Sequence, residues 1–347
     1  MLNKKSLNSN TRFISNILFD KEINLVSFPD KNNDKFWDKF VQIGSSHFVI
    51  PALYYKLKQR DYLRLLNDEL VSYLEEIYNQ NLKRNLELIK EVNEISNLFI
   101  TNKIDHVFLK GAALVSSIYK ETLGIRMVGD IDILIDNDQI LKAKSLMEDY
   151  GYKSPDRLFP PFEDYKKHLD RMINNKKIFA VELHLTISDK MKFDFHKFIN
   201  SKKNLNNILI PNQTDLLYHT IINYQLNDYG SIKAGFHLRT LFDVVNISNT
   251  KPYLIKQVPN SLHVRKIQVV LKNLNLIDYK TPLNLSLFEI RFKLINSFYF
   301  FSLINDFLFD IFKFITVSPV IRLKQIIALI LRKDYRTYVL KKLRIIK

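Results

Sequence analysis

The chain has 347 residues, of which 46% are hydrophobic and 25% are charged, a composition typical of a globular protein with a sizeable core. It has no cysteine and only 7 glycines, which excludes disulfide scaffolds, cysteine-bound zinc or iron–sulfur clusters and thiol catalysis, and no glycine-rich dinucleotide fingerprint occurs. With 52 Lys and Arg residues against 36 Asp and Glu residues the formal net charge is +16, which indicates an anionic partner: nucleotide phosphates, a nucleic acid or an anionic membrane surface.

The first 100 residues are predicted to be helical. Apolar side chains recur at spacings of mostly three and four between Asp68 and Ile100, as on one face of a long amphipathic helix. Pro51 is predicted to open a shorter helix, because proline is tolerated in a first helical turn. No group of catalytic residue types occurs here, so residues 1–100 are interpreted as a helical scaffold.

Residues 101–210 alternate between strand and helix patterns and are interpreted as an α/β core. The apolar run 106–109 predicts a strand that ends in a turn at Lys110 and Gly111, and a helix is predicted to begin at Ala112. A glycine lets the backbone approach a ligand, and a helix N-terminus favours negative charge. This junction therefore predicts a phosphate-binding turn.

Two further predicted strands carry acidic residues. Residues 128–135 alternate so that Asp130 and Asp132 share one face, about 7 Å apart at their Cα atoms. Two like charges on one strand are costly unless a cation lies between them, and a divalent ion such as Mg²⁺ or Mn²⁺ meets that need. Residues 179–185 predict another strand, and its Glu182 would join the cluster if the two strands are neighbours.

The segment between these two strands is predicted to hold a helix and a basic connection. The helix is expected over 141–150, with Gly151 as its C-terminal cap. Residues 153–177 contain three prolines and several lysines, which indicate an irregular basic connection or a hairpin.

Residues 211–347 are predicted to form a C-terminal helical domain with a basic amphipathic tail. Arg239 and Asp243 lie four residues apart and are expected to form an ion pair that stabilises a helix or links two domains. Residues 285–347 hold 12 Lys and Arg residues against 4 Asp and Glu residues, a net charge of +8. Within them, 320–332 has the pattern of a basic amphipathic helix, which packs on the domain or binds a nucleic-acid backbone or an anionic membrane surface.

The sequence shows no targeting signal. No apolar run of signal-peptide length follows the N-terminal lysines. The most apolar stretch, 294–317, contains Asn305, Asp306, Asp310 and Lys313, which are too many polar groups for a lipid-exposed spanning helix. A cytoplasmic location is therefore expected.

On these motifs the chain resembles the uncharacterised bacterial nucleotidyltransferase family, a branch of the DNA polymerase β-like nucleotidyltransferase superfamily. The resemblance rests on the runs FLKGAALVSSIY, LGIRMVGDIDILID and LKAKSLMEDYGY, with VELHL further on. It is strong over 107–151 and at 182–184, and moderate over 212–247. It implies an α+β fold in which a polymerase β-like nucleotidyltransferase core with a mixed sheet is flanked by N-terminal and C-terminal helical regions.

The resemblance also implies roles for the acidic residues. Asp130 and Asp132 would be metal-binding carboxylates. Glu182 would be the third, helping to bind the catalytic metal and to activate the acceptor hydroxyl. His184 falls where this branch tends to have a histidine, and would orient Glu182 or contact the substrate.

The same resemblance implies a nucleotide-binding set. Gly111 would mark the turn that faces the triphosphate, and Ala112 stands where superfamily members usually have a serine. Lys110 and Arg126 match family positions and are expected to contact phosphate oxygens.

The function expected is therefore that of a Mg²⁺- or Mn²⁺-dependent nucleotidyltransferase. It would move a nucleoside monophosphate from an NTP such as ATP to an unidentified hydroxyl acceptor and release pyrophosphate. Two alternatives stay open at this point: a glycosyltransferase whose D-x-D motif holds Mn²⁺ and a nucleotide sugar, and a non-catalytic module that binds nucleotide or nucleic acid.

Overall fold

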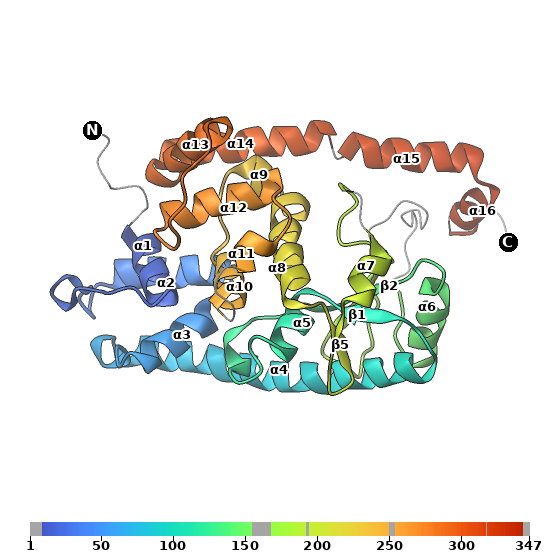
Figure 1. Cartoon of the computed structure of the whole chain (residues 1–347), viewed down its shortest axis with the longest axis horizontal. Coiled ribbons are helices and arrows are strands. Elements are labelled where there is room, and N and C mark those ends of the chain that lie inside the picture. Colours follow the sequence, from blue (N-terminus) through green and yellow to red (C-terminus); the bar gives the residue numbers. More distant parts are fainter. Residues whose placement is uncertain (1–8, 155–167, 192–193, 250–253, 317, 343–347) are drawn as a thin grey trace.

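The computed structural model describes residues 9–342 except 155–167, 192–193, 250–253 and 317. It has an α+β architecture in which helices flank a small mixed sheet on both sides (Figure 1). The predicted fold class, with helical regions before and after the sheet, is confirmed. Among the described helices, none combines the length and hydropathy that a membrane-spanning segment requires.

The N-terminal region consists of helices, as its apolar spacing predicted. Their bounds are α1 Ser9–Leu18, α2 Asp34–Ser46, α3 Ile50–Gln59 and α4 Asp68–Thr101. Pro51 lies in the first turn of α3. The Asn67 side chain caps α4 by accepting a hydrogen bond from the Leu70 backbone at 2.7 Å. Helix α4 runs along the lower edge of the molecule in Figure 1 and supports the elements that carry the sheet.

The central sheet has three strands in the order β1-β2-β3. They are β1 His106–Phe108, β2 Asp130–Ile135 and β3 Ala180–His184. β1 pairs antiparallel with β2, and β2 pairs parallel with β3, so the sheet is mixed as expected. Helix α5, Lys110–Ser116, follows β1, and α6, Ile140–Asp149, lies between β2 and β3 in the chain. The register of the parallel pair sets Asp132 opposite Glu182.

The connection before β3 forms a hairpin in its described part. Gly151 has φ of +93° just after α6, and the Tyr152 backbone N–H donates to the Met147 carbonyl, so the predicted glycine cap is confirmed. Met172 and Val181 then exchange two backbone hydrogen bonds of 2.8 and 2.9 Å. Of the three prolines of the connection, Pro155, Pro160 and Pro161, none lies within the described residues.

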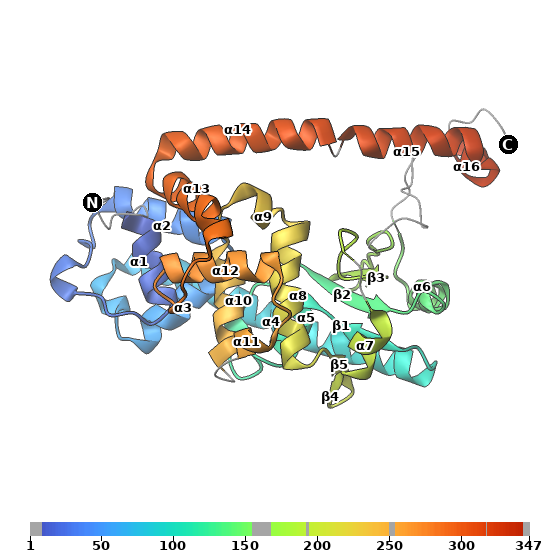
Figure 2. The ribbon, with the colours of Figure 1, turned by 45° about the horizontal axis from the view of Figure 1, so that its top comes forward.

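The remainder of the chain is mainly helical, as predicted. After α7, Phe195–Asn200, an unpredicted hairpin of β4 Lys203–Leu205 and β5 Ile208–Ile210 leads into the helices. The helices up to residue 297 are α8 Gln213–Ile222, the π-helical turn η5 Asn223–Asn227, α9 Gly230–Lys233, α10 Leu238–Asn249, α11 Leu254–Gln257, α12 Leu262–Asn273 and α13 Ser286–Ser297. The last three are α14 Tyr299–Thr316, α15 Ser318–Leu331 and α16 Lys333–Lys342. Figure 2 shows α14 and α15 end to end, as a rod along one side of the molecule.

One hydrophobic core joins the flanking helices to the sheet. It includes Phe40 of α2, Leu88 of α4, Ile133 of β2, Leu217 of α8 and Ile267 of α12, all fully buried. A smaller cluster packs on the other face of the sheet, around Val107, Leu109 and Leu134 with residues after β3 and from α7. The sheet is thus held on both faces, which fixes the strand that bears the acidic residues.

A buried ion pair connects the loop before β2 to α10. Arg126 Nε lies 2.9 Å from both carboxylate oxygens of Asp243, and Arg126 Nη2 lies 2.9 Å from Oδ2. Tyr119 donates its hydroxyl to the same carboxylate at 2.8 Å, and Asn85 of α4 donates to the Arg126 carbonyl at 2.7 Å. Asp243 therefore forms an interelement pair with Arg126. Arg239 lies instead over the Phe48 ring, 4.9 Å from its centroid.

A close contact at Gly111 joins α5 to the residues before β2. A Cβ at Gly111 would lie 2.7 Å from Val128 Cγ1 and 2.9 Å from Val128 Cγ2. Real Cβ atoms do not approach that closely, so only glycine lets Val128 pack against the start of α5.

We expect Asp243→Asn to lower the free energy of unfolding by about 3–5 kcal/mol, because it leaves the Arg126 guanidinium buried without a counter-charge. Urea unfolding followed by circular dichroism measures the change. The matched control is Glu87→Gln, which removes the exposed ion pair with Lys90 and should cost no more than about 1 kcal/mol. Equal, small losses in both variants would show that the buried pair does not stabilise the fold.

Gly111→Ala should lower the free energy of unfolding by about 1–3 kcal/mol through overpacking against Val128. In the double variant Gly111→Ala/Val128→Ala the two losses should be less than additive, because the smaller side chain makes room for the new Cβ. Gly235→Ala is the control, since a Cβ there would meet no atom within 4 Å. Strictly additive losses would contradict the packing role of Gly111.

Candidate active site

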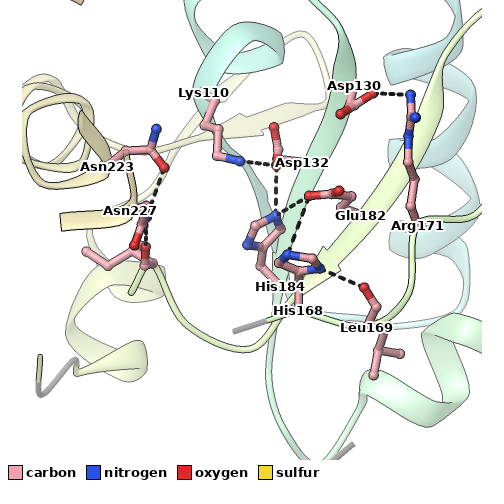
Figure 3. Close-up of polar contacts among 11 residues, drawn as sticks. Lys110, Asp130, Asp132, His168, Leu169, Arg171, Glu182, His184, Asn223 and Asn227 are labelled. Atoms are coloured by element: carbon pink, nitrogen blue, oxygen red, sulfur yellow. Dashed lines mark hydrogen bonds and ion pairs between the residues drawn. The ribbon is translucent and has the colours of Figure 1, made fainter. Parts of the chain in front are cut away.

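Parallel pairing of β2 and β3 brings three of the predicted residues together. Asp132 and Glu182 are register partners, and His184 follows two residues later on the same face of β3. One ligand atom from each of Asp132, Glu182 and His184 lies within 4.8 Å of the others. Figure 3 shows these side chains converging, with Lys110 approaching from the start of α5. We refer to Asp132, Glu182 and His184 as the acidic cluster.

Asp132 is the buried centre of the cluster, with 5% of its surface exposed. Its Oδ1 accepts hydrogen bonds from the Lys110 ammonium and, at 2.7 Å, from His184 Nε2. Burial by itself would raise the pKa of Asp132, but the charge of Lys110 and the His184 hydrogen bond hold it well below the usual range. Asp132 is therefore an anion despite its burial.

Glu182 lies between two imidazoles. Its Oε2 is 3.5 Å from His184 Nε2 and 3.9 Å from His168 Nε2. Burial raises the pKa of Glu182, whereas the His184 hydrogen bond and the charge of His168 lower it, and the net shift is downward. Because His168 Nδ1 lies 2.7 Å from the Leu169 carbonyl, which can only accept, Nε2 of that ring carries a proton only in the cationic form.

Asp130 shares the face of Asp132 but has a different environment. Its Oδ1 accepts a hydrogen bond of 2.6 Å from Arg171 Nη2, in the hairpin before β3. Burial raises the pKa of Asp130, Arg171 lowers it, and the nearby Glu182 and Asp132 raise it again, so the net shift is upward. The structure thus places Asp130 beside the acidic cluster, paired with Arg171, while His184 completes the set of converging ligand atoms.

Lys110 reaches the cluster from a strained backbone position. Its φ is +45°, a left-handed conformation that is costly for a residue with a Cβ. The Lys110–Asp132 ion pair and the Val128 contact at Gly111 hold the turn in this shape. The Lys110 side chain is 26% exposed, and its ammonium contacts Asp132.

The other expected phosphate contacts are placed differently. Gly111 and Ala112 are buried in the first turn of α5, where Gly111 accommodates Val128. The expectation that Arg126 contacts phosphate is corrected, because its guanidinium is buried and paired with Asp243. Of these four residues, Lys110 is the one whose side chain contacts the acidic cluster.

The structure adds residues that sequence reasoning did not select. His168 and Arg171 lie in the basic connection 153–177, whose composition showed positive charge but not its target. Asn223 and Asn227 of η5 lie beyond Lys110 in Figure 3. Asn227 Nδ2 donates to Asn223 Oδ1 at 2.9 Å and to the Ile187 carbonyl at 3.1 Å, which ties η5 to the segment after β3. In the sequence, the spacing of four residues between Asn223 and Asn227 was the one signal for this contact, because residues four apart face each other on a helix.

Comparison with known proteins gives one family match. A sequence family described as "Uncharacterised nucleotidyltransferase" matches residues 33–259, more than half of the chain. The matched range contains the sheet, the acidic cluster, Lys110 and the Arg126–Asp243 pair. None of the curated proteins compared with the chain matches it. The resemblance inferred from the sequence motifs is confirmed, and the chain belongs to this family of nucleotidyltransferases.

Proposed function

We propose that the chain transfers a nucleoside monophosphate from an NTP to a hydroxyl acceptor and releases pyrophosphate, with a divalent metal ion held by Asp132 and Glu182 and assisted by Asp130. The observation that supports this most is the pairing of two anionic carboxylates, Asp132 and Glu182, across parallel strands. Membership of a nucleotidyltransferase family supports the reaction class. Nothing in the described site favours the glycosyltransferase alternative over it.

The acidic cluster has the donor chemistry of a divalent metal site. Carboxylate oxygens such as those of Asp132 and Glu182 suit Mg²⁺ and Mn²⁺, while His184 Nε2 donates its proton to Asp132. The pKa values of Asp132 and Glu182 are both held below their usual ranges by neighbouring cationic and hydrogen-bonding groups, so both side chains are anionic and able to bind a cation. When bound, the metal would offset the negative charge of the triphosphate during transfer.

The chain's own residues have separable tasks in this proposal. Glu182, a carboxylate beside Asp132 in the acidic cluster, accepts the proton of the acceptor hydroxyl. As that proton leaves, a bond forms between the acceptor oxygen and the α-phosphorus, and the bond from the α-phosphorus to the pyrophosphate oxygen breaks. Lys110, whose side chain is partly exposed, pairs with phosphate oxygens.

His184 acts as a positioning residue rather than a reacting group. It is fully buried, and its Nε2 donates to Asp132 while lying near Glu182. His184 therefore holds the carboxylates of Asp132 and Glu182 in position relative to each other.

Asp132→Asn should reduce nucleotidyl transfer by roughly 10²–10³-fold, because the charge that would hold the metal is removed. The assay incubates the protein with each α-labelled NTP, Mg²⁺ or Mn²⁺ and cell extract, and it measures labelled acceptor and released pyrophosphate. Asp138→Asn, an exposed change in the turn after β2, is the control and should leave the rate unchanged.

Three outcomes of this assay would contradict the proposal. An unchanged rate in Asp132→Asn would remove the acidic cluster from the reaction. Tight NTP binding without label transfer or pyrophosphate release in the unmodified protein would indicate a non-catalytic nucleotide-binding module. Turnover of nucleotide sugars in place of NTPs would indicate a glycosyltransferase.

Mn²⁺ should raise the melting temperature of the unmodified protein, since a ligand at a hundredfold excess over its Kd stabilises the folded state by about 2.7 kcal/mol. Asp132→Asn and Glu182→Gln should abolish most of this increase, whereas Asp138→Asn should retain it. Differential scanning calorimetry at matched ionic strength measures the shift. The same Mn²⁺-dependent increase in all variants would place the metal elsewhere.

A further inference from the structure

The last three helices form an arm that stands apart from the acidic cluster. We call α14, α15 and α16, residues 299–342 without 317, the C-terminal arm, and Figures 1 and 2 show α14 and α15 as a rod along one side of the molecule. The inner face of α14 is attached to α9 and α13. The Asn305 amide donates to the Lys233 carbonyl at 3.0 Å and accepts from Arg291, and the Phe309 ring lies against Tyr229, 5.5 Å between centroids.

The opposite face of α14 is an apolar stripe without a partner among the described residues. Phe300, Ile304, Phe307, Ile311 and Phe314 are exposed and recur at spacings of three and four, which places them on one side of the helix. Exposed Leu303, Leu308 and Ile315 widen this stripe. Phe314 is 74% exposed and Phe300 is 67% exposed, values that a soluble surface rarely combines in one contiguous row.

Helix α15 also carries exposed apolar side chains on one side. Its Ala328 packs with Tyr335 and Val339 of α16, so that side of the helix is covered. Leu323, Ile326 and Ile330 lie on the other side and are exposed, together with Ile327 and Leu331. The C-terminal arm therefore presents unpartnered apolar rows on two successive helices.

The positive charge of the arm is concentrated in α15 and α16. Residues 318–342 contain 7 Lys and Arg residues and 1 Asp residue, and residues 285–347 supply +8 of the chain's net charge of +16. Lys313, in the last turn of α14, and Lys333, at the start of α16, are both exposed. Asp306 and Asp310 lie toward one flank of the α14 stripe, which leaves the outermost row entirely apolar.

We propose that the C-terminal arm binds the surface of an anionic lipid bilayer, with α14 and α15 lying in the interfacial plane. An amphipathic helix with an apolar face and basic residues matches a surface that has acyl chains below anionic headgroups. None of the described helices meets the requirements of a spanning segment, which agrees with in-plane binding.

The charge and the apolar rows of the C-terminal arm disfavour two other binding partners. A second copy of the chain would bring another segment of net charge +8 against the first, and like charges repel. A nucleic-acid backbone would satisfy the positive charge but would leave the exposed leucine and isoleucine rows in water. An anionic bilayer satisfies both features at once.

Vesicle co-sedimentation of the full chain tests the proposal. The protein is mixed with vesicles of phosphatidylcholine alone, or of equal parts phosphatidylcholine and phosphatidylglycerol, at low and high salt. We expect binding to the anionic vesicles that weakens as salt is added, and at least about tenfold weaker binding to phosphatidylcholine alone.

Two sets of variants separate the apolar and electrostatic contributions. Phe307→Ser/Phe314→Ser should weaken binding by roughly tenfold for each phenylalanine. Lys313→Gln/Lys333→Gln should weaken it by roughly fivefold for each lysine, and only on anionic vesicles. Val26→Ser, at a 95% exposed valine of the N-terminal region, is the matched control and should bind as the unmodified protein does.

A fluorescent variant gives a second measurement that does not depend on loss of binding. Phe314→Trp keeps the stripe apolar, and its emission should shift to the blue with anionic vesicles, while the buried Trp37 gives a constant background. The proposal is overturned by any of three results: no binding to anionic vesicles, equal and salt-independent binding to both vesicle types, or a dimer or RNA complex that forms in place of vesicle binding and is lost in Phe307→Ser/Phe314→Ser.

Discussion

Two carboxylates facing each other across parallel strands are the constraint around which the site is built. The register of β2 and β3 sets Asp132 opposite Glu182, and burial makes their repulsion costly. Lys110, His184 and His168 offset this repulsion. Lys110 and His168 come from outside β2 and β3, whereas His184 lies in β3. Lys110, the first residue of α5, has a left-handed backbone conformation and places its ammonium on the buried Asp132 carboxylate.

The scaffold holds this arrangement through buried polar contacts rather than packing alone. Arg126, which precedes β2, is fixed by Asp243 of α10 on one side and by Asn85 of α4 on the other. Gly111 leaves room for Val128 to pack against the start of α5, which carries Lys110. The helical regions on both flanks therefore contribute directly to the position of the strand that carries Asp132. Among the described residues, the outer face of the C-terminal arm carries exposed apolar side chains, which is the physical basis for assigning it a separate surface.

Much of the local structure could be predicted from sequence patterns. Strand alternation placed Asp130 and Asp132 on one face, helical spacing identified α4, and Gly151 marked the end of α6. The partners of charged residues were harder to predict. Arg126 looked like a phosphate ligand and Asp243 like the partner of Arg239, yet the two pair with each other across 117 residues of sequence. Such pairings depend on which faces of two distant elements become buried together, and spacing along the chain carries no information on that.

The sequence by itself determined which chemical groups each element presents: acidic residues on two apolar strands, a lysine and glycine after a third, and a basic, apolar C-terminus. These are local consequences of backbone periodicity. Only the tertiary structure decided that Asp132 and Glu182 are register partners, that His184 rather than Asp130 completes the converging ligand set, and that Arg171 holds Asp130. Those choices depend on strand pairing between segments about 50 residues apart, which is set by burial of both sheet faces and not by any local preference.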